Sequence, residues 1–107
     1  MNKDTEKKIQ QFQIIEQQLD NIILQKQNFQ VQLAENENAS VELEKSNKTP
    51  YKIIGTIMVS SERSSLLKDL KESREIIELR LKTLEKQENN LKEKAESLQK
   101  DLMEELK

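Results

Sequence analysis

The chain has 107 residues, of which 36% are charged, 34% are hydrophobic and 3% are aromatic, and its net charge is −2. This hydrophobic share is low for a globular domain with two packed layers, and the near-neutral charge argues against a nucleic-acid-binding protein, which would carry basic surfaces. The absence of histidine and cysteine excludes thiol chemistry, disulfides and histidine-based zinc or catalytic sites.

The first predicted element is a helix over residues 4–46, which contain neither glycine nor proline. A seam of positions recurs in it at alternating spacings of three and four residues, which is the heptad pattern of a coiled coil. The seam positions are Phe12, Ile15, Leu19, Ile22, Lys26, Phe29, Leu33, Asn36, Ser40 and Leu43. Nine glutamines lie between residues 10 and 32. Because glutamine is a good helix former, we interpret them as a solvated helix face rather than an aggregation-prone tract.

The second predicted element is a β-hairpin over residues 50–60, the one segment rich in β-branched residues. Pro50 disfavours helix before it, and Gly55-Thr56 suits a two-residue turn with glycine first. The pairing then sets Ile54 against Ile57, Ile53 against Met58 and Tyr51 against Ser60. Both faces of this hairpin are mostly apolar.

The third predicted element is a helix over residues 61–106, with Ser60 or Ser61 as its N-cap. Its seam is more uniformly aliphatic than that of the first helix. The positions are Leu67, Leu70, Arg74, Ile77, Leu81, Leu84, Glu88, Leu91, Ala95, Leu98 and Leu102.

The two seams coincide when the chain is folded back at Gly55-Thr56. Phe12 then falls beside Leu98, and Leu33 beside Ile77, and the polar seam residues also fall near each other, with Asn36 beside Arg74 and Lys26 near Glu88. Opposed polar layers of this kind fix the register of a coiled coil. The sequence therefore predicts a mainly α fold, a long antiparallel two-helix coiled coil joined by a single β-hairpin that oligomerises, in one unit spanning residues 1–107.

The hairpin is the predicted assembly surface. A lone two-stranded hairpin is marginally stable in water, and its open edges invite pairing with another chain. We expect it to join the hairpins of other subunits in a barrel or sheet; the alternative is a single strand over residues 51–59 docked in a partner. The assembly residues are Tyr51, Ile53, Ile54, Gly55, Ile57, Met58 and Val59.

Several other classes of function are disfavoured by the sequence. An acid–base pair needs a desolvated cleft, which a solvated coiled coil does not offer, so we predict no enzyme activity, no catalytic residue, no metal and no cofactor. The chain has no run of 18 apolar residues, and no apolar core follows residues 1–6. We therefore expect a cytoplasmic protein with neither a membrane nor a nucleic acid as partner.

Three stretches of the sequence resemble the prefoldin family, most closely its archaeal β-type subunit. They are Gln25-Lys26-Gln27 in the first helix, Tyr51-Lys52-Ile53-Ile54-Gly55 with Met58-Val59 in the hairpin, and the run IELRLKTLEKQE over residues 77–88. The resemblance implies a hexamer of two α-type and four β-type subunits, with coiled coils projecting from a platform of hairpins. It further implies that the ends of the coiled coils hold unfolded polypeptides and deliver them, without ATP, to a group II chaperonin.

The implied client-binding surface is formed by the two chain ends. Its residues are Ile9, Phe12, Ile14, Leu98, Leu102, Met103 and Leu106. Phe12, Leu98 and Leu102 lie in the seam, whereas the other four lie outside it and would be partly wet. Apolar residues elsewhere off the seam, namely Ile23, Leu24, Val31, Ile76 and Leu79, are interpreted as scattered exposed side chains. The alternative function is a structural coiled-coil spacer or tether, whose hairpin only oligomerises it.

Overall fold

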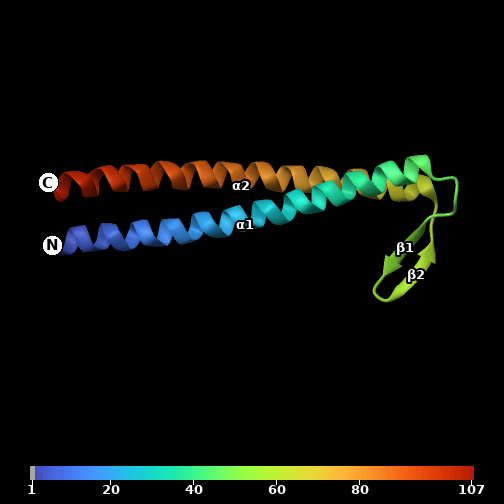
Figure 1. Cartoon of the computed structure of the whole chain (residues 1–107), viewed down its shortest axis with the longest axis horizontal. Coiled ribbons are helices and arrows are strands. Elements are labelled where there is room, and N and C mark those ends of the chain that lie inside the picture. Colours follow the sequence, from blue (N-terminus) through green and yellow to red (C-terminus); the bar gives the residue numbers. More distant parts are fainter. Residues whose placement is uncertain (1) are drawn as a thin grey trace. The chain divides into compact units, whose positions relative to one another are not determined.

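The computed structural model describes residues 2–107 and contains four elements in chain order. These are helix α1 (Lys3–Lys45), strand β1 (Tyr51–Ile54), strand β2 (Ile57–Ser60) and helix α2 (Arg63–Glu105), as Figure 1 shows. Two long helices with a single hairpin between them were predicted, and this is confirmed. The residues group into two compact units. The terminal unit joins the chain up to Asn28 with the chain from Leu81 onward, and the hairpin unit is residues 29–80.

Both helices start at residues that the sequence analysis did not single out. In α1, Oδ1 of Asn2 accepts a hydrogen bond from the backbone N–H of Thr5 at 2.7 Å, which is the geometry of an N-cap. In α2, the carbonyl of Glu62 accepts the first helical bond, from Leu66 at 3.1 Å, so the predicted cap at Ser60 or Ser61 was wrong. The backbone N–H of Ser61 instead donates to the carbonyl of Pro50 at 3.1 Å, which keeps Ser61 with the hairpin.

The seam predicted from the heptads is the packed face of both helices. Every predicted seam position is buried or half-buried. In the terminal unit the most buried apolar side chains are Ile15, Ile22 and Leu84, and in the hairpin unit the most buried one is Ile77. The core of each unit is therefore a narrow row of side chains between two antiparallel helix segments, as in a coiled coil.

The polar seam residues are satisfied within their own units. In the terminal unit, Nζ of Lys26 lies 3.2 Å from Oε1 of Glu88, as predicted. In the hairpin unit, the buried amide of Asn36 donates to the carbonyl of Leu70 at 2.9 Å. Asn36 was expected beside Arg74, and its partner lies one helical turn before that residue. The amide satisfies a backbone acceptor there, so no charged partner is required.

The strand pairing follows the predicted register throughout. Tyr51 pairs with Ser60, Ile53 with Met58 and Ile54 with Ile57 in one antiparallel ladder. Gly55 has a φ of 62°, and no other described residue has a positive φ. A positive φ at the first turn position alone is the pattern of a type II′ turn, which favours glycine there because a Cβ strains this conformation.

Arg63 fastens the loop between α1 and β1 within the hairpin unit. Its guanidinium donates to the carbonyl of Ser46 and, at 3.4 Å, to that of Lys48. Those carbonyls lie at and just beyond the end of α1, where helix acceptors lack intrahelical partners. Arg63 thus links the end of α1 to the start of α2.

Candidate functional site

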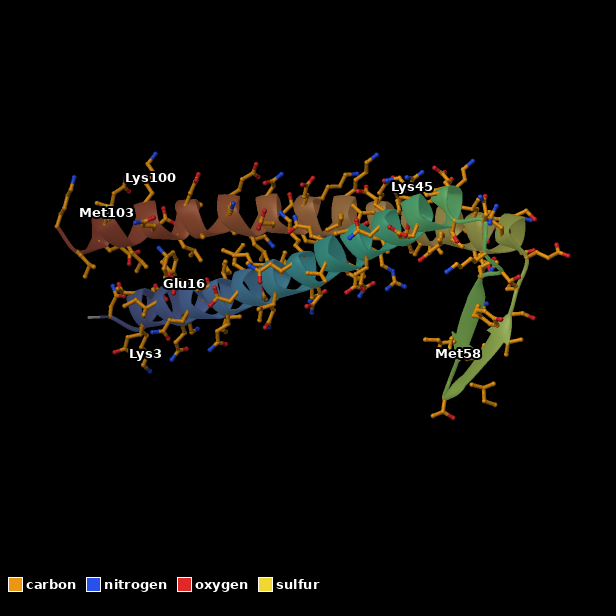
Figure 2. The ribbon with its side chains drawn as sticks, turned by 45° about the vertical axis from the view of Figure 1, so that its right-hand side comes forward. Lys3, Glu16, Lys45, Met58, Lys100 and Met103 are labelled. Atoms are coloured by element: carbon orange, nitrogen blue, oxygen red, sulfur yellow. The ribbon has the colours of Figure 1, made fainter. Side chains whose placement is uncertain are left out.

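The hairpin presents a continuous apolar surface on both of its faces. Cross-strand pairing places Tyr51, Ile53 and Met58 on one face. Ile54, Ile57 and Val59 occupy the other face. All six side chains are between 44% and 71% exposed. Figure 2 shows Met58 on this hairpin. The hairpin lies beside the helices of its unit, and its side chains do not pack into their seam.

This geometry suits association with another β-structure. Each strand has only four residues and hydrogen-bonds to one neighbour, so its outer edge carries unpaired backbone groups. Contiguous exposed apolar surface of this kind marks interaction sites in soluble proteins. All of the predicted assembly residues therefore lie together in one exposed element, and their role in assembly stays a prediction.

The chain-end residues predicted to bind clients are gathered at the ends of the helices in the terminal unit. Ile14, Met103 and Leu106 are 53%, 61% and 64% exposed, respectively. Met103 lies on the last turns of α2 (Figure 2). The seam residues Phe12, Leu98 and Leu102 are half-buried, and so is Ile9, in keeping with a partly wet position off the seam. We call these seven residues the chain-end surface; their contact with clients stays a prediction.

A polar cluster beside the chain-end surface was missed by the sequence analysis. Thr5 is 4% exposed, and its hydroxyl donates to Oε2 of Glu105 at 2.7 Å. Nζ of Lys8 donates to Oε1 of the same carboxylate. The available signal was the seam itself, because stepping back four and then three residues from Phe12 reaches positions 8 and 5. Hydrogen bonds therefore connect the two helices beyond the last apolar seam residues.

The hydrogen bonds of this cluster shift two pKa values in opposite directions. The hydrogen bond from Lys8, followed by that from Thr5, lowers the pKa of the Glu105 carboxyl below its usual value. The hydrogen bond to Glu105 likewise raises the pKa of Lys8. Both shifts favour the charged forms, which are the forms that make the contact.

The other exposed apolar residues do not belong to the chain-end surface. Ile23, Leu24, Val31, Ile76 and Leu79 are all between 41% and 66% exposed and lie on the flanks of the two helices. Ile76 lines a shallow hollow of about 430 Å³ with Phe29 and Arg80. The guanidinium of Arg80 lies over the Phe29 ring, 5.6 Å from its centroid, in a cation–π contact.

Over residues 2–107, no three histidine, cysteine, aspartate or glutamate side chains gather in a way that could hold a metal ion. In the same range, no helix is long and apolar enough to cross a membrane.

Comparison with known proteins identifies the family to which this chain belongs. The family model for prefoldin subunits matches residues 6–107. The chain belongs to the prefoldin family. This prefoldin subunit is 35% identical over 100 residues to the prefoldin β subunit of Pyrobaculum islandicum, an alignment that covers 92% of the chain and 80% of that relative. It is 39% identical over 95 residues to the β subunit of Archaeoglobus fulgidus, with 86% of the chain and 82% of the relative covered.

A solved structure supports the same assignment. The prefoldin β subunit from Thermococcus strain KS-1 superposes with a TM-score of 0.90 at 31% sequence identity. The match covers 99% of this chain and 95% of that one. The predicted resemblance to a β-type prefoldin subunit is thereby confirmed, and the chain is a subunit of a chaperone family.

Proposed function

We propose that this prefoldin subunit is an ATP-independent holdase that captures unfolded polypeptides on its chain-end surface. It then delivers them to a group II chaperonin in the cytoplasm. The observation that carries the proposal is the exposure of Ile14, Met103 and Leu106, each by more than half, at the paired helix ends. Exposed apolar area is what an unfolded chain can bind, and methionine adapts to varied partners.

Assembly multiplies this surface. Four β-type copies and two α-type subunits, joined through their hairpins, form the proposed hexamer. The exposure of both strands, all eight residues of which are open to solvent, supports this because each apolar face needs a cover. Several chain-end surfaces on one platform hold one client more tightly than any single surface does.

The proposal is tested by comparing two triple variants that change equal numbers of exposed apolar side chains. The chain-end triple is Ile14→Ser, Met103→Ser and Leu106→Ser. The control triple is Leu24→Ser, Val31→Ser and Ile76→Ser, whose parent side chains are similarly exposed. Each is assembled with an α-type subunit, and light scattering follows a test protein diluted from denaturant.

We expect the wild type and the control triple to delay aggregation equally, and the chain-end triple to lose most of the delay. Native mass should be the same for all three, since no substitution falls in the hairpin. If the chain-end triple delays aggregation as fully as the wild type, the client surface lies elsewhere. If the wild type itself gives no delay, the chain is a coiled-coil spacer rather than a holdase.

A further inference from the structure

A column of glutamines on α1 departs from ordinary coiled-coil chemistry. Gln11, Gln18 and Gln25 recur every seven residues, each directly before a seam position. This is the g position of the heptad, which usually carries charged residues that pair across the helices. Uncharged amides at three successive g positions give up those ion pairs but keep hydrogen-bond donors and acceptors.

The column lines one groove between α1 and α2 in the terminal unit. Gln11 and Gln18 border a hollow of about 450 Å³ with Ile14 and Leu98. Gln18 and Gln25 border a second hollow of about 450 Å³ next to it. The two hollows share Gln18, Leu91 and Lys94, so they form a continuous groove. Its outer part overlaps the chain-end surface at Ile14 and Leu98.

The lining combines an apolar floor with amide walls. Ile15, Ile22 and Leu91 contribute the floor. Asn21, Gln87 and Asn90 add three more amides to the glutamine column, and Lys94 is the one charged residue that lines either hollow. A side-chain amide both donates and accepts hydrogen bonds, as a peptide group does. Such a wall can pair with a backbone whatever its sequence.

The spacing of the column fits an extended chain. Seven helical residues rise about 10.5 Å, which equals about three residues of extended backbone at 3.3–3.4 Å each. From Gln11 to Gln25 the helix rises about 21 Å, or about six extended residues. A helix from a second copy fits the groove less well, because its own backbone groups are already hydrogen-bonded.

We propose that this groove binds an extended segment of about six residues of unfolded polypeptide, with the glutamine column hydrogen-bonding its backbone and the apolar floor holding its side chains. The inference rests on the proposed holdase function and adds how clients of unrelated sequence are held. A lining with Lys94 as its one charged residue suits it, since a fixed pattern of many charges would select among client sequences.

The test removes the amides without adding charge. The groove triple is Gln11→Ala, Gln18→Ala and Gln25→Ala, and the control triple is Gln10→Ala, Gln17→Ala and Gln27→Ala, which line neither hollow. Alanine is the strongest helix former, so both variants should keep their helix content. The probe is fluorescein-labelled α-lactalbumin held unfolded by reduction and carboxymethylation. Its anisotropy is measured with each full chain assembled in its complex.

We expect the groove triple to raise Kd by about tenfold, since three hydrogen bonds are lost, and the control triple to change it less than twofold. A groove triple that binds as tightly as the wild type, or more tightly, would contradict recognition of the client backbone by the amides. Binding through apolar contacts alone would not weaken, because trimming the glutamines leaves the apolar floor more accessible to the client. If the wild type instead forms larger assemblies and the groove triple does not, the groove binds a second copy of the chain and not an unfolded client. Wild-type protein that binds no probe would overturn the proposed function together with the groove.

Discussion

Single polar residues in the coiled-coil seam, at its outer end and in its interior, form specific hydrogen bonds. Thr5 and Lys8 occupy seam positions where an apolar side chain would be expected, and both bind the carboxylate of Glu105. Asn36 is buried deeper in the hairpin unit and reaches a backbone carbonyl of the facing helix segment. Each polar group is satisfied by a defined partner, so these residues favour one alignment of the helices.

The Glu105 contact predicts a pH dependence of the helix ends. The pKa of Glu105 is lowered in the folded chain, so its contribution is fully present above the unfolded value of about 4.3. It is lost as the pH falls through the folded value. The raised pKa of Lys8 acts at the other extreme, where its contribution is lost only as the pH rises through its folded value, above about 10.4.

We therefore expect the backbone amides of Thr5 and Glu6 to exchange faster with solvent after Glu105→Gln at pH 7. NMR hydrogen exchange measures this against Glu104→Gln, which changes a neighbouring carboxylate outside the hydrogen bonds from Thr5 and Lys8. Once the pH is well below the folded pKa of Glu105, the wild type and Glu105→Gln should exchange alike, because both then carry a neutral group. Equal exchange at pH 7 would contradict a stabilising role for the cluster.

At the scale of the elements, the heptads carried enough information to locate both seams. Every predicted position is packed because a coiled coil buries only a stripe, and a stripe is fully specified by spacing. The hairpin register was equally predictable, because Gly55 fixes the turn and pairing follows from it. The N-cap of α2 could not be predicted in this way. Ser61 is held by its hydrogen bond to the carbonyl of Pro50, and that bond depends on how the two ends of the hairpin come together.

Of the candidate sites, one could be predicted from the sequence and two could not. The hairpin surface could be predicted because an apolar run in a polar chain is visible in the sequence. The Thr5–Glu105 cluster was missed because polar residues at the outermost seam positions look, in the sequence, like the end of the seam. The glutamine groove was missed because a column of neutral g positions matters only once the facing residues of α2 are known.

The seam pair of Lys26 and Glu88 leads to an asymmetric prediction. Their side chains are 19% and 13% exposed, and Glu88 also lies 3.8 Å from Lys92. Lys26→Met leaves Glu88 with Lys92, whereas Glu88→Leu leaves the Lys26 ammonium half-buried without its partner. We expect Glu88→Leu to lower the free energy of unfolding by about 1–3 kcal/mol more than Lys26→Met.

Urea denaturation of the two single variants and the double variant measures this difference. The double variant should recover most of the loss, because two apolar side chains then face each other. Equal destabilisation by both single variants would contradict the role of Lys92 as a second partner.

The hairpin predicts a loss of assembly after a charge is placed on its surface. Ile54→Asp with Ile57→Asp puts two carboxylates opposite each other on one face, and burying them in an interface costs several kcal/mol. Sedimentation should show loss of the oligomer, while circular dichroism shows that the helices remain. Lys52→Gln on the same face is a control, because it replaces one exposed polar side chain with another and adds no carboxylate beside Asp69. A double variant that runs at the full mass of the complex would exclude the hairpin as the interface.

At the scale of the whole molecule, the surfaces proposed for assembly and for client holding belong to different units. The hairpin belongs to one unit and the chain-end surface to the other, and residues 15–45 of α1 and 63–97 of α2 separate them along the chain. Coiled-coil packing is local, so a change at the chain ends should leave the hairpin free to assemble. Assembly and client holding should therefore be separable.

The most direct test is the aggregation of a denatured protein in the presence of a subunit that lacks residues 1–12 and 99–107. This truncation removes Ile9, Phe12, Leu102, Met103 and Leu106 but keeps the seam from Ile15 inward. We predict assembly to the native mass, allowing for the deleted residues, and loss of most of the delay in light scattering. A truncated subunit that assembles and still delays aggregation in full would contradict client capture at the chain ends.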